Sequence, residues 1–169
     1  RMSTVRFTKY HGLGNDYIII DPNKNKHIQQ LSPKSIQQIC DRNYGAGFDG
    51  ILFGPLYDND NNDTICMVRM YNPDGGEFEK SGNGLRIFCK YLYDEYQTLF
   101  NIEPNIPFHL KLYKTSEIIK AKIIENNDKT INIQVGIGKP RFDPTSIPCN
   151  SNCNQVLKQK MIIDGINII

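Results

Sequence analysis

The sequence predicts a protein of the α/β (α+β) class, and three observations support this prediction. Two segments carry the apolar spacing of amphipathic helices, and each lies between short stretches with strand patterns. After residue 107 the period changes, and residues 108–113, 117–124 and 130–137 have the pattern of consecutive antiparallel strands, with a hairpin turn at 126–128. A chain of 169 residues, 39% of them hydrophobic, is long enough for one domain with a buried core.

The N-terminal part is predicted to form two strands and then a helix. Residues 5–10 and 17–20 have strand patterns, and the glycine-containing segment between them is expected to turn. The helix is expected to open at Ser32 and Pro33, because serine is a favoured N-cap and proline suits the first helical turn. The apolar face of this helix would contain Ile36, Ile39 and Cys40, and its end is expected at Gly45 and Gly47.

The middle of the chain is predicted to contain two further strands and a second helix. Residues 51–53 and 64–71 have strand patterns, and the loop 72–84 is rich in glycine and polar residues. The helix follows, to about Tyr96, with an apolar stripe of Leu85, Phe88, Cys89 and Leu92. After a proline- and asparagine-rich loop, residues 161–169 are predicted to be a last strand.

The charge balance and the cysteine count limit the classes of function. Twenty basic and eighteen acidic residues leave a net charge of +2, so no nucleic-acid partner is expected. No apolar run is long enough to span a bilayer and no signal-peptide pattern is present, so no membrane partner is expected either. Five cysteines without a secretion signal favour reduced thiols and a cytoplasmic location.

None of the cysteines is expected to bind a metal. Cys40, Cys66 and Cys89 fall in apolar patterns, where we expect them to be part of the core. Cys149 and Cys153 lie in a polar loop without the further ligands that a zinc site needs. The sequence therefore predicts no metal site.

The densest group of polar residues and glycines lies at 72–86. Gly82, Asn83 and Gly84 stand where the second helix begins, so free backbone N–H groups are expected to point outward and to attract an anion such as a carboxylate. Ser81 would stand at the mouth of that site. An ordinary N-cap explains the same serine equally simply.

Two other glycine-rich stretches are candidates for a binding site. In residues 11–16 the two glycines are expected to carry positive φ angles, and Asn15 would be able to hydrogen-bond a ligand. A tight turn explains this stretch as well, and it is not a dinucleotide fingerprint because no helix follows it. Residues 42–50 form the second stretch, which the end of a helix also explains.

Together these stretches resemble the diaminopimelate epimerase family of cofactor-independent amino-acid epimerases. The family's His-Gly-Leu-Gly-Asn-Asp-aromatic motif is matched by residues 11–17, and its Gly-x-Gly-x-Asp-Gly motif by residues 45–50. Its Asn-x-Asp-Gly loop is matched by residues 72–75, and its Cys-Gly-Asn-Gly-x-Arg motif by residues 81–86, except at the first position. Residues 135–140 look like the glycine segment near the end of the family's first half.

The resemblance implies a particular fold and reaction. Such enzymes have two similar halves, each a curled, mostly antiparallel sheet wrapped around a central helix, with the site in the cleft between them. One cysteine thiolate removes the α-proton and the other thiol returns a proton from the opposite face, without pyridoxal phosphate or metal. Residues 1–169 would then be a single N-terminal epimerase-type domain whose C-terminal half is absent, and we expect no appreciable activity unless a second chain completes the cleft.

The family's site residues can be carried over position by position. Asn15 and Asn72 would bind the amino-acid substrate, and Gly82 and Asn83 would offer N–H groups to its α-carboxylate. Ser81 occupies the position of the catalytic cysteine, and a serine hydroxyl is a poor proton shuttle unless another base activates it. This serine fits either a natural, altered relative or an engineered Cys→Ser change.

Three functions are consistent with the sequence. The first is an epimerase that interconverts LL- and meso-diaminopimelate in lysine and cell-wall synthesis, completed by a second half or as a homodimer. The second is another two-base racemase or isomerase. Proline racemases, however, carry Cys-Gly-His where this chain has Ser81-Gly82-Asn83. The third is a non-catalytic binding or assembly module, which Ser81 favours and the retained asparagines disfavour.

Overall fold

The computed structural model describes residues 4–57, 64–125, 131–147, 149, 156, 161–163 and 166–168. The chain divides into two compact units, residues 1–137 and residues 138–169. None of the described helices is long and apolar enough to cross a membrane.

The first unit is built on one sheet of seven strands whose spatial order follows the chain. The strands are β1 (Thr8–Gly12), β2 (Asn15–Ile20), β3 (Gly50–Leu56), β4 (Met67–Tyr71), β5 (Pro107–Leu112), β6 (Ile118–Glu125) and β7 (Ile131–Val135). The pairs β2–β3 and β4–β5 are parallel, and the other four are antiparallel. Each parallel pair needs a crossover, which α1 (Pro33–Cys40) and α2 (Gly82–Tyr96) supply.

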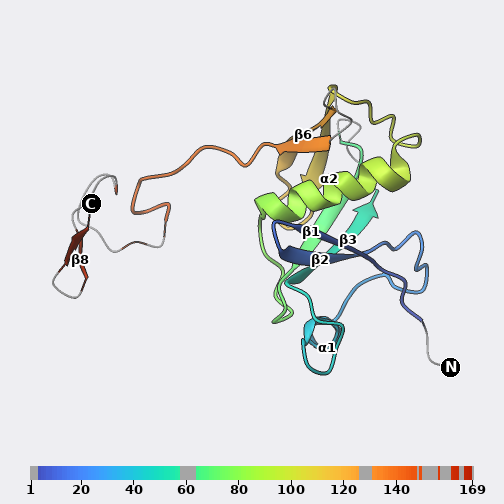
Figure 1. Cartoon of the computed structure of the whole chain (residues 1–169), viewed down its shortest axis with the longest axis horizontal. Helices are drawn as coiled ribbons and strands as arrows, with labels where there is room; N and C mark the ends of the chain where they lie inside the picture. Colours follow the sequence, from blue (N-terminus) through green and yellow to red (C-terminus); the bar gives the residue numbers. More distant parts are fainter. Residues whose placement is uncertain are drawn as a thin grey trace. The chain divides into compact units, whose positions relative to one another are not determined.

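The sheet curls around α2. This helix contacts β1 and β7, the two edges of the sheet, as well as β2, β3 and β6. Its predicted stripe is fully buried, with Leu85, Phe88, Cys89 and Leu92 in the main core cluster. Figure 1 shows α2 lying across the strands. The predicted α+β class, with a curled and mostly antiparallel sheet around a central helix, is confirmed.

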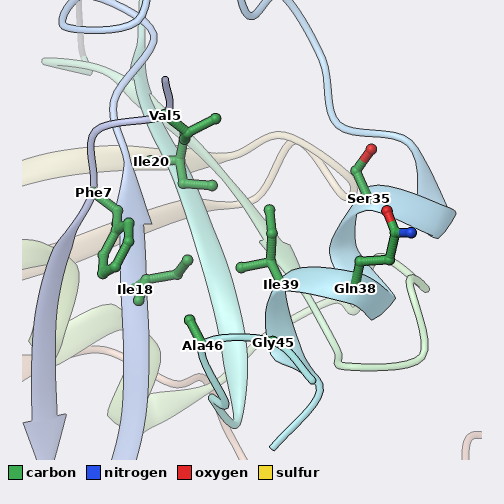
Figure 2. Close-up of a pocket in the computed structure, with 9 residues that line it drawn as sticks. All are labelled: Val5, Phe7, Ile18, Ile20, Ser35, Gln38, Ile39, Gly45 and Ala46. Atoms are coloured by element: carbon green, nitrogen blue, oxygen red, sulfur yellow. The ribbon is translucent and has the colours of Figure 1, made fainter. Parts of the chain in front are cut away.

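The short helix α1 covers the other face of the sheet. Ile36 and Cys40 pack there with Ile18 and Ile20 of β2, while Ile19 between them faces the α2 side. This strand has a continuous apolar sequence because both of its faces are covered. A cavity of about 330 Å³ remains on this face; Figure 2 shows its apolar lining of Val5, Phe7, Ile18, Ile20, Ile39 and Ala46.

The start of α1 is predicted correctly and its end is not. Ser32 accepts a hydrogen bond from the Ser35 amide over 3.1 Å, and Pro33 is the first helical residue. The helix ends at Cys40, before Gly45 and Gly47, because Asp41 already has a non-helical backbone and caps it. Gly45 belongs to the following turn, where a Cβ would lie only 2.0 Å from the Gln38 carbonyl oxygen.

The first hairpin also differs from the prediction. The strands extend into residues 11–16, so that Gly12 pairs with Asn15 and only Leu13 and Gly14 remain as the turn. Both have positive φ angles, 55° and 87°, as the type I′ turn of a two-residue hairpin requires. The expectation that both glycines carry positive φ is therefore wrong for Gly12, whose place in the turn is taken by Leu13.

The last three strands of the first unit are antiparallel neighbours, as predicted. The predicted turn at 126–128 lies outside the described residues. In the second unit the predicted single strand 161–169 is a short antiparallel pair, β8 (Met161–Ile163) and β9 (Ile166–Ile168). Cys40, Cys66 and Cys89 are buried, as expected.

Candidate functional site

The directions of strands β2, β3 and β4 bring the three glycine-rich stretches to the same end of the sheet. Asn15 begins β2, and Asp49 directly precedes the parallel strand β3. Since β4 runs antiparallel to β3, Asn72, which directly follows the end of β4, also lies at this end of the sheet. Residues from three distant parts of the sequence therefore share one end of the sheet.

A side-chain hydrogen bond joins this end of the sheet to the start of α2. The Asn83 Nδ2 donates to Asn15 Oδ1 over 3.2 Å, and Arg86 Nη2 donates to Asn83 Oδ1. Both ends of the Asn83 amide are thus engaged, which fixes its orientation. The Arg86 guanidinium adds positive charge beside the first turn of the helix.

Asp49 holds Asn15 from the other side. Its Oδ2 accepts from Asn15 Nδ2 and from the Asp16 amide, each over 2.9 Å, and its Oδ1 accepts from Arg42 Nη2 over 2.7 Å. These hydrogen bonds lower the pKa of Asp49, the Asp16 amide being the largest cause. No role for Asp49 or Arg42 is predicted from the sequence, although both lie in the glycine-rich stretch 42–50.

Asp16 also contributes ion pairs and a hydrogen bond at this end of the sheet. Its carboxylate lies 3.0 Å from Lys9 Nζ and 3.0 Å from Arg42 Nη2, and it accepts from the Asp49 amide over 3.2 Å. Burial alone would raise the pKa of this carboxyl, but the hydrogen bonds and charges of Lys9 and Arg42 outweigh burial and lower the pKa to about 2.

Ser81 is the N-cap of α2. Its Oγ accepts a hydrogen bond from the Gly84 amide over 3.0 Å, so the simple N-cap interpretation is correct for this contact. The helix begins at Gly82, slightly earlier than predicted. No described residue accepts a hydrogen bond from the amides of Gly82 and Asn83. These two donors and the helix dipole suit an anion.

Packing does not require a glycine at position 82. A Cβ there would lie 3.7 Å from Arg86 Nη1 and 3.8 Å from Ile137 Cγ2, which are ordinary contacts. A glycine costs stability in a helix, so its presence here fits a site that a ligand approaches closely.

Asn72 lies at the same end of the sheet, but among the described residues no hydrogen bond joins it to Asn15 or Asn83. Its backbone closes a turn, with its amide donating to the Gly76 carbonyl over 2.8 Å and its carbonyl accepting from Gly75 over 3.0 Å. The exposed Asn72 side chain makes no hydrogen bond with the described residues. It is therefore available to a ligand.

The described ranges contain no group of three or more His, Cys, Asp or Glu side chains placed to hold a metal ion. The groups at this end of the sheet can form hydrogen bonds through backbone amides and asparagine side chains, and Arg42 and Arg86 are neighbouring cations.

The fold of the first unit, a curled sheet around a central helix, is also found in solved structures of an isomerase and a racemase. Among solved structures, a methylitaconate-delta-isomerase matches with a TM-score of 0.54 at 15% identity, over 74% of this chain and 61% of that one. A probable proline racemase from Agrobacterium radiobacter matches with a TM-score of 0.50 at 12% identity, over 77% and 41% of the two chains. At these identities the likeness concerns the fold alone.

The sequence comparisons are more specific. The model of the diaminopimelate epimerase family matches residues 7–142, and the chain belongs to this family. It is 40% identical to diaminopimelate epimerase 2 of Nostoc sp. over 95% of its own length and 51% of that protein. It is 36% identical to diaminopimelate epimerase of Methanocella arvoryzae, over 87% and 48% of the two chains. The chain thus spans about half the length of these relatives.

Proposed function

We propose that residues 1–169 form the N-terminal domain of a cofactor-independent epimerase that interconverts LL- and meso-diaminopimelate in lysine and cell-wall synthesis. Membership of the family and the names of the relatives support this proposal. The observation that carries it is the hydrogen bond from Asn83 to Asn15, which joins two motifs into one polar surface at the start of α2.

In this proposal the start of α2 binds the substrate's α-carboxylate. The amides of Gly82 and Asn83 donate to the carboxylate oxygens, and the helix dipole and Arg86 supply positive potential. Asn15 and Asn72 bind the other polar groups of the amino acid. These assignments are supported by the amides of Gly82 and Asn83 and the side chain of Asn72, for which the described residues provide no hydrogen-bond partner.

Ser81 stands where the family's first catalytic base would be. A two-base epimerisation needs one group that removes the α-proton and a second that returns a proton to the opposite face. The Ser81 hydroxyl is far less acidic than a thiol, and it already caps the Gly84 amide. We therefore propose that the chain binds substrate but does not take its α-proton.

The partner in this proposal is a second half of the epimerase type or a second copy of the chain. The relatives are about twice as long as this chain, which leaves room for a second half with the second base. Neither a cofactor nor a metal takes part in the proposed reaction, and we propose a cytoplasmic location.

Interconversion of LL- and meso-diaminopimelate tests the proposal. The chain would be joined to the C-terminal half of the Nostoc sp. relative and incubated with LL- and meso-diaminopimelate in D₂O, with either Ser81 or Ser81→Cys. We expect interconversion of the two isomers with the cysteine and none with the serine, because the base of the second half alone can exchange the proton of one isomer but cannot invert the carbon. Interconversion with both would contradict the role of position 81.

The N-cap contact of Ser81 also favours a second candidate, a non-catalytic binding module that kept the fold. Interconversion of the isomers by neither protein, together with ligand binding by both, would support this module and overturn the epimerase proposal.

A further inference from the structure

The side chain of Lys80, directly before Ser81, connects two distant parts of the first unit. Its Nζ lies 2.5 Å from Glu117 Oε1 in the turn between β5 and β6. The same nitrogen donates to the Ile137 carbonyl over 3.2 Å. The Lys80 side chain is only 24% exposed. One cation thus ties the residue before the helix cap to the segment that follows β7.

The segment held by Lys80 lies beside the proposed carboxylate site. Ile137 Cγ2 is 3.8 Å from the position that a Cβ would take on Gly82. The Gly136 amide donates to the Lys120 carbonyl over 2.9 Å, which fixes the backbone just before Ile137. The Ile137 side chain is 62% exposed in this structure, so it is not held in place by burial in the core.

An apolar side chain at this point has a physical use. Hydrogen bonds from the Gly82 and Asn83 amides to an anion become stronger where water is kept away from them. Ile137 Cγ2 lies beside Gly82, where an apolar side chain would limit the access of water to these amides. The backbone carbonyl of Ile137 is bound to Lys80, which makes the placement of this side chain depend on the lysine.

We propose that Lys80 is a positioning residue that fixes Ile137 as the apolar wall of the carboxylate site at the start of α2. The inference rests on the proposed function. Lys80 acts through Ile137 without touching the ligand, and Glu117 holds the ammonium group in place. The same contacts predict that Lys80→Arg retains the effect, because arginine can also donate to both oxygens.

The first part of the test needs no ligand. Lys80→Met, Lys80→Arg and a control, Lys24→Met, would be compared by NMR in the 169-residue chain. Lys24 forms a similar ion pair with Glu95, at 2.6 Å and with 40% exposure, and its Nζ also lies over the Tyr91 ring; neither Glu95 nor Tyr91 belongs to the proposed site. In Lys80→Met alone, the NOE between the Ile137 methyl and Gly82 α protons should vanish, and the Gly136 amide should exchange about threefold to tenfold faster.

The second part measures the dissociation constant for LL-diaminopimelate. We expect about threefold to tenfold weaker binding by Lys80→Met, and near wild-type binding by Lys80→Arg and Lys24→Met. An unchanged NOE, or equal binding by the wild type and Lys80→Met, would overturn the inference and leave the proposed function standing. If none of the proteins binds LL-diaminopimelate while the NOE is lost in Lys80→Met, the proposed function and the role of Ile137 in ligand binding would both be overturned.

Discussion

The side chain of Asn83, at the start of α2, donates a hydrogen bond to Asn15, which lies 68 residues earlier at the start of β2. Asn15 in turn donates to Asp49, so that consecutive side-chain hydrogen bonds connect the three glycine-rich stretches. These contacts join the polar end of strands β2–β4 to the first-turn amides of α2, which have no acceptor among the described residues.

Asn15→Ala should destabilise the chain more than Asn72→Ala. The first change removes a donor to Asp49 and an acceptor for Asn83, which should cost about 1 to 2 kcal/mol. The exposed side chain of Asn72 makes no described hydrogen bond, so its loss should cost less than about 0.5 kcal/mol. Urea denaturation measures both, and equal losses would contradict the described network.

The ion pairs of Asp16 predict a pH-dependent contribution to stability. The folded-state pKa of about 2 is below the ordinary value, so the contribution is fully present above about pH 5 and is lost as the pH falls toward 2. Asp16→Asn should lower the unfolding free energy by about 1 to 2 kcal/mol at neutral pH. The difference from the wild type should shrink near pH 2, and a difference that stays constant in urea denaturation at both pH values would be evidence against these ion pairs.

Alanine at positions 82 and 50 should have opposite effects on stability. Gly82→Ala places a methyl group at ordinary contact distances and should stabilise α2 by up to about 1 kcal/mol, while it weakens binding of a carboxylate at the amides. Gly50→Ala would place a Cβ 2.6 Å from the Tyr71 carbonyl oxygen and should cost about 2 kcal/mol or more. Thermal denaturation and ligand titration would check both; unimpaired binding by Gly82→Ala would argue against the proposed site.

A thiol introduced by Ser81→Cys should react much faster than the core cysteines. Burial raises the pKa of Cys40 to about 11 and that of Cys89 to about 12, and it raises the pKa of Cys66 as well. A thiol at the start of α2 should have a lowered pKa, since the helix dipole favours the thiolate. Alkylation with iodoacetamide near neutral pH, followed by peptide mapping, compares these sites. Equal labelling of Cys89 and the introduced thiol would contradict this difference.

The sequence predicts those parts of the fold that depend on local patterns. The apolar stripe of α2 and the cap at Ser32 are both found in the structure, because spacing and capping are properties of neighbouring residues. The end of α1 was predicted too late because Asp41 leaves the helical conformation before the first glycine. The first hairpin turn is predicted, but its residues are not, because Leu13 takes the positive φ that was expected of Gly12, which is unusual for a residue with a side chain.

The candidate site could be predicted residue by residue but not as an arrangement. The family motifs single out Asn15, Asn72 and Asn83, yet no local pattern reveals the contact between residues 15 and 83. The support by Asp49 and the link from Lys80 to Ile137 depend on strand order and on the end of β7. Such contacts arise from the curl of the sheet around α2, which a single sequence does not specify locally.

The most direct test of the carboxylate site is an NMR titration of the ¹⁵N-labelled chain with LL-diaminopimelate. Cadaverine serves as the control, because it has both amino groups of the substrate but neither carboxylate. We expect LL-diaminopimelate to shift the backbone amides of Gly82 and Asn83 and the side-chain amide of Asn72, whereas cadaverine leaves the two backbone amides unchanged. Shifts elsewhere with none at Gly82 and Asn83, or equal shifts of these amides with cadaverine, would contradict a carboxylate site at the start of α2.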